Sequence, residues 1–136
     1  MAGEACVPIN WDADIIMARA HGRALAERLG FSRNDLTLIA TAISEVARNI
    51  VEYAKHGEIV VEPLQKGDRC GIVVIARDDG PGIPNVALAM QDGYSTGKSL
   101  GLGLPGAKRL MDEFEIASEV GKGTTVTMRK WAPQNG

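Results

Sequence analysis

Hydrophobic residues in the first half of the chain recur with the period of a helix. From Leu36 onward they return every three or four positions, which places them on one helical stripe: Leu36, Ile39, Ile43, Val46, Ile50 and Ala54. Ser32 and Asp35 have the spacing of a capping box, so we expect this helix to begin after Ser32. It is expected to end near Gly57.

An earlier helix is predicted from about Asp12 to Leu29, because Gly30 follows it as a stop signal. The short apolar run "CVPI" at residues 6–9 comes before this helix and predicts a strand. The chain is therefore expected to open with a strand and two helices.

The middle of the chain changes to a strand pattern. Residues 58–64 ("EIVVEPL") and 70–77 ("CGIVVIAR") are rich in β-branched residues, and Lys-Gly-Asp at 66–68 predicts a hairpin turn between them. A short helix is expected near residues 85–91, followed by a loop of Gly, Ser and Thr at residues 92–100.

A further helix is expected over about residues 103–112. After it, "FEIASEV" and "TTVTMRK" predict a second hairpin around Gly-Lys-Gly at 121–123. Helices thus alternate with antiparallel strand pairs. This order favours an α+β fold, a two-layer sandwich whose mostly antiparallel sheet is covered on one face by helices, over a doubly wound parallel sheet.

Length and composition restrict the class of protein. The 136 residues are enough for a self-sufficient core, and without repeats, low-complexity tracts or linkers we expect residues 1–136 to form one domain. With 45% hydrophobic and 24% charged residues, the chain has the composition of an ordinary soluble protein. Its net charge of −2 and scattered basic residues give no electrostatic footprint for nucleic acid.

Membrane and secretion signals are not found in the sequence. No apolar run approaches the roughly 20 residues that span a bilayer, and the N-terminus has no signal-peptide pattern, so we expect a cytoplasmic protein. Cys6 and Cys70 have no metal-binding spacing and are expected to be buried reduced thiols and not a disulfide. Whether the protein forms homo-oligomers stays open.

Glu45 and Asn49 lie one helical turn apart and therefore share a helix face. At about 100° per residue, Glu45 points away from the apolar stripe, toward solvent or a cleft. A carboxylate beside a carboxamide can position a hydroxyl group and hold Mg²⁺, which needs few protein ligands when phosphates and waters complete its coordination. A solvated helix face with Arg48 and Glu52 is the other interpretation of this pair.

Asp78 ends the second predicted strand of the first hairpin and precedes Asp-Gly-Pro-Gly. Gly80 and Gly82 let the backbone adopt positive φ or approach a flat ligand. A carboxylate at such an opening can accept a hydrogen bond from an exocyclic amine such as that of adenine. A tight turn without a ligand explains the same residues.

A second glycine motif, Gly101-x-Gly103-x-x-Gly106, leads into the predicted helix at 103–112. Free N–H groups at a helix start can hold phosphate oxygens. No strand-GxGxxG-helix unit opens the chain and no ribose-binding acid follows at the expected distance, so a Rossmann dinucleotide site is excluded. The polar stretch before it, "MQDGYSTGKS", is typical of a lid.

These motifs, taken in order, resemble the Bergerat nucleotide site of the GHKL superfamily: E-x-x-x-N (Glu45, Asn49), D-x-G-x-G (Asp78, Gly80, Gly82), a lid, G-x-G-x-x-G (Gly101, Gly103, Gly106) and G-T (Gly123, Thr124). The stretches "AISEVARNI", "DDGPGIP" and "DGYSTGKSLGLGLPGAKRLMDEFEI", with "KW" near the end, resemble the small serine kinases of this superfamily that act as switch kinases of bacterial stressosomes. The resemblance spans roughly residues 6–131.

The resemblance implies a role for each matching residue. Glu45 would be the general base that takes the proton of a serine or threonine hydroxyl, and Asn49 would be the Mg²⁺ ligand. Asp78 would accept a hydrogen bond from the adenine amine, and Thr124 would help to fix Asp78 or a bridging water near the base. The remaining expected nucleotide contacts are Gly80, Gly82, Ile83, Gly101, Leu102, Gly103 and Gly106.

The resemblance also implies the reaction and its partners. The protein would use ATP and Mg²⁺ to phosphorylate STAS-domain proteins of a stressosome, and would then bind and activate a PP2C-type phosphatase. An anti-sigma factor kinase of the same fold is the alternative, and a module that binds nucleotide without turnover is another. A histidine kinase fragment is disfavoured because Gly22 and Arg23 follow His21, where a phosphoacceptor helix has an acidic residue.

Overall fold

A computed structural model describes residues 5–83, 86–90 and 103–133 of the chain. It contains one sheet of five strands in the order β1-β2-β3-β5-β4, and every neighbouring pair is antiparallel. The strands are β1 (Ala5–Ile9), β2 (Gly57–Lys66), β3 (Arg69–Asp78), β4 (Glu113–Glu119) and β5 (Gly123–Trp131).

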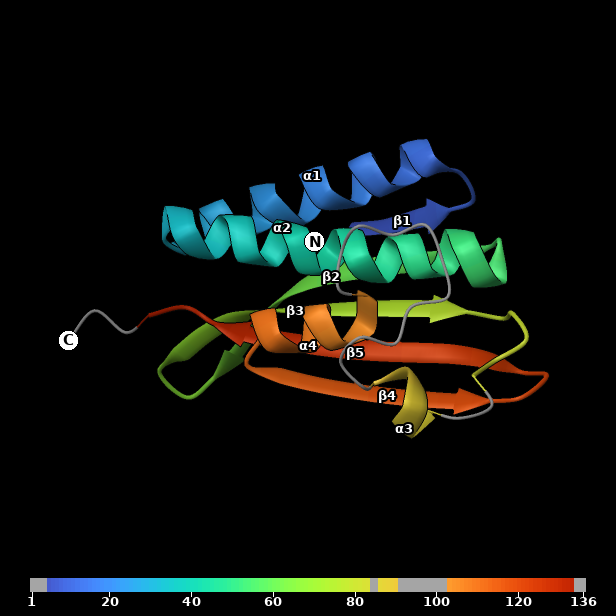
Figure 1. The fold of residues 1–136 in the computed structure, drawn as a ribbon. Helices are drawn as coiled ribbons and strands as arrows, with labels where there is room; N and C mark the ends of the chain where they lie inside the picture. The colour runs from blue at the N-terminus through green and yellow to red at the C-terminus, as the bar shows by residue number, and fades with distance from the viewer. Residues whose placement is uncertain (1–4, 84–85, 91–102, 134–136) are drawn as a thin grey trace.

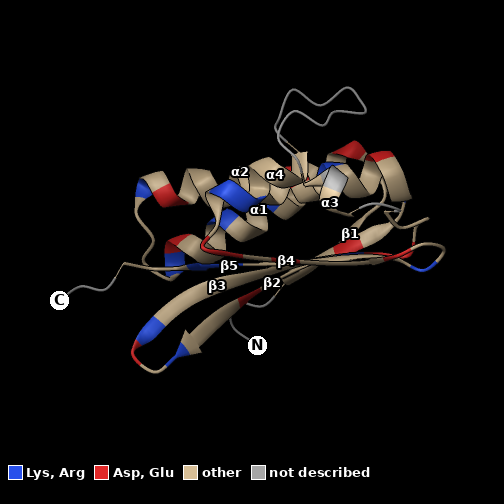
Figure 2. Cartoon of the chain, turned by 60° about the horizontal axis from the view of Figure 1, so that its bottom comes forward, with Lys and Arg blue, Asp and Glu red and all other residues tan. Residues whose placement is uncertain are grey.

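Three helices cover one face of the sheet and leave the other face open (Figures 1 and 2). They are α1 (Asp12–Arg28), α2 (Arg33–Asn49) and α4 (Gly103–Leu110). A π-helical turn, η1 (Ile50–Ala54), continues α2, and a short helix, α3 (Val86–Ala89), lies between β3 and α4 in the sequence. The structure confirms the predicted α+β sandwich with its antiparallel sheet and one helical layer. The expected burial of the two cysteines is wrong: Cys6 and Cys70 are free thiols, and both are exposed.

Both predicted hairpins are present. The β2–β3 turn pairs Lys66 with Arg69, and Gly67 adopts φ +61° between them, as a tight turn requires. The β4–β5 turn pairs Glu119 with Gly123. Both turns were predictable because Gly-containing turn signals act locally.

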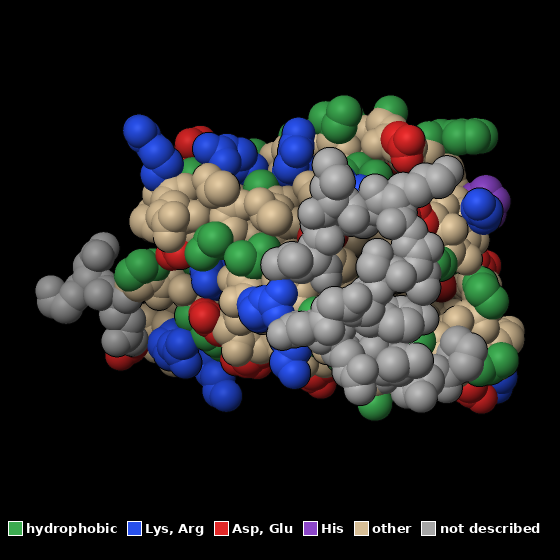
Figure 3. All heavy atoms as spheres, viewed as in Figure 1, with side chains coloured by type: hydrophobic (Ala, Val, Ile, Leu, Met, Phe, Trp, Pro, Cys, Tyr) green, Lys and Arg blue, Asp and Glu red, His purple; other side chains and the backbone are tan. Residues whose placement is uncertain are grey.

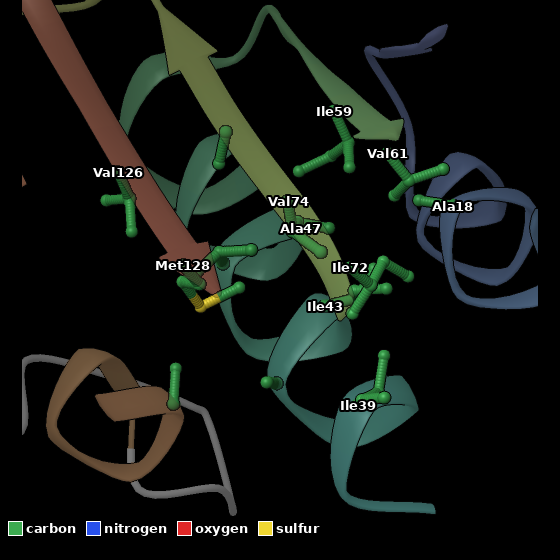
Figure 4. Close-up of a cluster of buried hydrophobic side chains, with 14 of the residues drawn as sticks. Ala18, Ile39, Ile43, Ala47, Ile59, Val61, Ile72, Val74, Val126 and Met128 are labelled. Atoms are coloured by element: carbon green, nitrogen blue, oxygen red, sulfur yellow. The ribbon is translucent and has the colours of Figure 1, made fainter. Parts of the chain in front are cut away.

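The core lies between the sheet and α2 (Figure 4). Every second residue of the central strands points toward the helices and is almost fully buried. These side chains pack against the apolar stripe of α2. These core residues include Ile59 and Val61 of β2, Ile72 and Val74 of β3, Val126 and Met128 of β5, and Ile39, Ile43 and Ala47 of α2.

The second helix begins as predicted and ends in an unexpected geometry. The Asp35 backbone N–H donates to Ser32 Oγ over 3.1 Å, which is the predicted N-cap. At its other end the Lys55 N–H donates to the Ile50 carbonyl over 2.8 Å, which gives the wider π turn. None of the helices in the described residues is both long and apolar enough to cross a membrane.

Candidate functional site

Glu45 lies at the contact between α2 and α4. Its side chain is 8% exposed, and both of its oxygens have partners. Arg48 Nη1 lies 3.1 Å from Oε2, and the Gly103 backbone N–H donates to Oε1 over 3.2 Å. The solvated-face interpretation of Glu45 is therefore wrong: the side chain points off the core stripe, as helical geometry predicts, but α4 covers that flank of α2.

Helix α4 presents its N-terminus at this point. Gly103 is its first residue and adopts φ +66°, and Gly106 is buried within the helix together with Leu104, Pro105 and Ala107. The helix thus begins where the second glycine motif predicts, although it ends at Leu110 and not near residue 112. Gly101, Leu102 and residues 91–99 of the expected lid lie outside the described residues.

Asn49 is the last residue of α2 and is half-buried. It follows Glu45 by one turn, as expected from the spacing, and the π turn η1 begins at the next residue. Such π turns in proteins are frequent at functional sites. The sequence offers no signal for this one.

Asp78 and Thr124 are neighbours although 46 residues separate them. The β3–β5 register pairs them directly, and Asp78 Oδ1 accepts hydrogen bonds from the Thr124 N–H (3.3 Å) and the Gly80 N–H (2.9 Å). Thr124 is buried, and its contact with Asp78 is made by the backbone amide. Its hydroxyl instead lies 2.8 Å from Ser118 Oγ.

The glycines after Asp78 allow two close backbone contacts. A Cβ on Gly80 would lie 2.6 Å from the Cβ of Ala54, so this loop packs against η1. Gly82 adopts φ +79°, and a Cβ there would collide with the carbonyl oxygen of Glu119. The positive φ predicted for this motif is confirmed at Gly82, where it brings the loop against the β4–β5 hairpin.

Ser118 is a site residue that the motifs do not identify. Its Oγ accepts a hydrogen bond from the Ile83 N–H over 2.7 Å and lies 3.2 Å from the Gly123 carbonyl oxygen. Ile83 packs against the core, so Ser118 ties the glycine loop to the final hairpin. The alternation of β4 carries a signal for it, because Ser118 is a polar residue on the same side as Phe114 and Ile116.

These elements lie toward one end of the sheet (Figure 1). The end of β3, the end of α2 with η1 and the β4–β5 turn lie there, and α4 lies nearer the middle of the sheet with its N-terminus directed toward that end. The contact between Gly80 and Ala54 joins the first two. The predicted residues that the structure describes thus come from segments remote in sequence and lie between the N-terminus of α4 and this end of the sheet.

The donors and acceptors at this edge fit a nucleotide with a divalent cation. Both hydrogen bonds that the described residues donate to Asp78 go to Oδ1, so Oδ2 can accept one from an amine. The N-terminal N–H groups of α4 suit phosphate oxygens. The Asn49 carboxamide supplies an oxygen of the kind that Mg²⁺ prefers.

A separate groove of about 720 Å³ borders the same edge. Arg77, Ala117 and Thr125 line it, and these residues alternate along their strands with the core-facing ones. The groove therefore opens on the uncovered face of the sheet, away from Glu45 and α4. Asp78 and Thr124 also line this groove, but the groove is not the candidate site, because Glu45 and α4 lie on the opposite face of the sheet.

The chain matches the family described as "Histidine kinase-like ATPase domain" over residues 12–130. It is 48% identical over 131 residues to the serine/threonine-protein kinase RsbT of Bacillus subtilis, covering 96% of this chain and 98% of that protein. It is also 32% identical over 119 residues to the anti-sigma F factor of Clostridium kluyveri, covering 83% of this chain and 82% of that protein.

Solved structures agree with the fold. The RsbU and RsbW domains of a Mycobacterium tuberculosis protein are similar with a TM-score of 0.58 and 25% identity over 95% of this chain, which spans 33% of that longer chain. The mycobacterial sensor histidine kinase MprB is similar with a TM-score of 0.56 and 16% identity, covering 95% of this chain and 97% of that chain. At that identity the likeness concerns the fold alone.

Proposed function

The chain belongs to the histidine kinase-like ATPase domain family, and on that premise we propose that it is an ATP- and Mg²⁺-dependent serine/threonine protein kinase of a partner-switching system. Its similarity to a serine/threonine kinase over nearly the whole length of both proteins supports this activity. Because the proposed reaction consumes ATP, we also propose that the protein acts in the cytoplasm.

The contact between Glu45 and Gly103 is the observation that carries the proposal. It puts a buried carboxylate at the first N–H of a helix whose positive end favours phosphate oxygens. A carboxylate at a helix start also stabilises the helix, so the rate of phosphoryl transfer, and not stability, has to test the catalytic role. The position suits a base that acts next to a bound triphosphate.

At the other end of the proposed site, Asp78 accepts a hydrogen bond from the adenine amine. Its Oδ1 is held by two backbone N–H groups, which fixes the direction of Oδ2. Gly80, Gly82 and Ile83 form the wall beside the base, and Thr124 fixes Asp78 through its amide. Ser118 holds this wall in place through the Ile83 N–H.

The phosphates lie at the second glycine motif in this proposal. Gly101, Leu102, Gly103 and Gly106 contribute backbone contacts, and Asn49 contributes an oxygen ligand to Mg²⁺. Bound Mg²⁺ would neutralise charge on the phosphates. The residues of the chain would then act mainly by holding the triphosphate in the geometry that the transfer requires.

Glu45 performs the proton transfer in the proposed reaction. Its carboxylate takes the proton of a serine or threonine hydroxyl of the substrate protein, and the hydroxyl oxygen forms a bond to the γ-phosphorus. The bond from this phosphorus to the bridging oxygen breaks, and ADP leaves. Arg48, 3.1 Å from Oε2, orients the carboxylate so that Oε1 faces the reacting groups.

We further propose that the substrates are STAS-domain proteins of a stressosome and that the kinase then binds and activates a PP2C-type phosphatase. An anti-sigma factor kinase that sequesters a sigma subunit is the second candidate, and the similarity to an anti-sigma F factor favours it. The higher identity and coverage of the kinase relative support the first candidate.

Transfer of labelled phosphate from ATP to a cognate STAS-domain protein tests the activity. We expect wild-type protein to label a serine or threonine of the substrate and Glu45→Ala to label it at least about 10²-fold more slowly. Equal rates for the two proteins would remove Glu45 as the base. No transfer at all, with ATP bound, would favour a module that binds nucleotide without turnover.

Partner choice needs its own experiment. The tagged chain is used to capture proteins from the lysate of its source cell, with intact-mass analysis of what is recovered. We expect a STAS-domain protein and a PP2C-type phosphatase. Recovery of a sigma subunit in place of the phosphatase would establish the anti-sigma alternative.

A further inference from the structure

In the part of the chain that the structure describes, two charged residues are buried, and each contacts one end of α4. Glu45 of α2 accepts a hydrogen bond from the Gly103 N–H at the start of the helix. Lys130 of β5 donates from Nζ to the Leu110 carbonyl oxygen at its end, over 3.1 Å. Lys130 is 9% exposed. Glu45 belongs to the candidate site, whereas the proposed reaction gives Lys130 no part.

A buried lysine at this position is costly, because an ammonium group taken out of water must find acceptors. At the neighbouring positions on the same side of β5 the chain has apolar residues, Val126 and Met128, and both are buried. The Lys130 Nζ has two acceptors, the Leu110 carbonyl oxygen and Asp112 Oδ1 at 3.8 Å. The strand thus replaces apolar packing with a polar bond where it meets the end of α4.

The two buried charges bind the groups that a helix cannot pair internally. Gly103 is the first residue of α4 and Leu110 is the last, so the N–H of one and the carbonyl group of the other have no partner within the helix. A negative charge at the start and a positive charge at the end both match the helix dipole. Two other elements, α2 and β5, therefore hold α4 at its opposite ends.

Asp112 fixes the end of α4 on the same strand. Its Oδ2 accepts from the Trp131 backbone N–H over 2.8 Å, and its own N–H donates to the Arg129 carbonyl oxygen over 2.9 Å. These two backbone partners lie on either side of Lys130 in the sequence. The end of α4 consequently has a defined place along β5, and the ammonium group of Lys130 is held beside it.

Helix α4 is short enough to carry this constraint to its other end. Its eight residues span only about 12 Å, so a shift of one end along the helix axis also moves the other end. We propose, on the premise of the proposed ATP site, that Lys130 is a positioning residue for the triphosphate. It fixes α4 along its axis and thereby sets where the N–H groups at the start of the helix meet phosphate oxygens. Lys130 acts through α4, at the end away from the phosphates.

The affinities of Lys130→Met for ATP and for adenosine test this role. Methionine is a long, flexible side chain that fills the space without an ammonium group. We expect ATP affinity to fall at least about ten-fold, because contacts to a reacting group tolerate little displacement. Adenosine has no phosphates and would contact only the Asp78 end of the site, so its affinity, measured by nuclear magnetic resonance titration, should stay nearly the same. An unchanged ATP affinity, or equal losses for both ligands, would overturn the proposal.

Lys108→Met is the matched control. Lys108 lies in the last turn of α4 and is exposed. Basic side chains are visible at the surface over α4 (Figure 3), so the control removes a positive charge near the same helix end without removing the bond to Leu110. We expect it to keep its ATP affinity. A loss as large as that of Lys130→Met would reduce the effect to general electrostatics and would overturn the proposal.

Lys130→Arg tests the bond itself, since arginine keeps both the charge and a donor. It is expected to recover most of the ATP affinity that Lys130→Met loses. An equal loss in both variants would assign the effect to the shape of the side chain and reject the bond as its cause. Because the readouts are affinities, a wild-type protein that binds ATP without transferring phosphate would count against the kinase activity alone. A wild-type protein that binds no ATP would overturn both proposals.

Discussion

Glu45 accepts a hydrogen bond of 3.2 Å from the backbone N–H of Gly103, 58 residues later in the chain. The donor is the first N–H of α4, a group that has no partner within its own helix. A phosphate bound at this helix start would compete for the same donor. The proposed base is thereby coupled to the proposed phosphate site through one shared N–H group.

Replacing Glu45 with Gln tests the base separately from the contact. The Gln side chain has the same shape and keeps an oxygen that can accept from Gly103, but it cannot take a proton. We expect the rate of phosphoryl transfer to fall by about 10²–10⁴-fold with ATP affinity nearly unchanged. Single-turnover transfer and calorimetric ATP binding measure the two effects, with the exposed Glu27→Gln as control. A variant that keeps its rate would exclude Glu45 as the base.

Arg48 is expected to position Glu45. Its Nη1 lies 3.1 Å from Oε2, and the Arg48 side chain is 35% exposed whereas that of Glu45 is 8% exposed. Arg48→Ala removes one of the two hydrogen-bond donors that the described residues supply to the buried carboxylate, which should lower the free energy of unfolding by about 1–3 kcal/mol. Transfer should slow while the KM for ATP stays the same. Arg48→Lys restores a charge and should recover part of the rate, whereas a purely structural role would leave the rate of the folded Ala variant unchanged.

Asp78→Asn is expected to weaken nucleotide binding. The carboxamide oxygen can still accept from Gly80 and Thr124, so the loop should keep its shape, but an NH₂ group can take the place of Oδ2 and then faces the adenine amine, donor against donor. We expect a loss of about 1–3 kcal/mol in ATP binding, measured by calorimetry. The affinities of the wild-type protein and the Asp78→Asn variant for inosine triphosphate, which lacks the amine, should differ far less. An unchanged ATP affinity would show that adenine binds elsewhere.

Ser118→Ala removes the acceptor of the Ile83 N–H and the hydroxyl partner of Thr124. A partly buried N–H without a partner costs about 1–3 kcal/mol, so urea unfolding should show a loss of stability in this range. The loosened loop should also lower ATP affinity while the rate with saturating ATP is maintained. Ser32→Ala, which removes a helix cap far from the site, is the control: it should cost about 1 kcal/mol of stability without a change in affinity.

The features that could be predicted from the sequence depend on local signals. The two hairpins follow from turns such as that at Gly67, and the start of α2 follows from Ser32. The apolar stripe of α2 could also be predicted, because hydrophobic residues that recur every three or four positions lie on one face of a helix. The spacing of Glu45 and Asn49 also predicts that they share a face, because residues four positions apart lie one turn apart on a helix.

The remaining features depend on contacts between distant segments. Glu45 is buried because α4 packs against α2, and no residue near Glu45 indicates that neighbour. The pairing of Asp78 with Thr124 depends on the register between β3 and β5, which no turn connects directly. Ser118 acquires its role only when the glycine loop folds back onto β4.

Gly82→Ala should destabilise the protein more than Gly67→Ala. Both glycines have positive φ, +79° and +61°, so both substitutions carry the cost of a left-handed backbone, about 1–2 kcal/mol. At Gly67 a Cβ would meet nothing within 4 Å, whereas at Gly82 it would collide with the Glu119 carbonyl oxygen. We therefore expect urea unfolding to show a loss at Gly82 that exceeds the loss at Gly67 by about 1–3 kcal/mol. The added loss belongs to the contact between the glycine loop and the β4–β5 hairpin, and equal losses would mean that this contact contributes nothing beyond the turn.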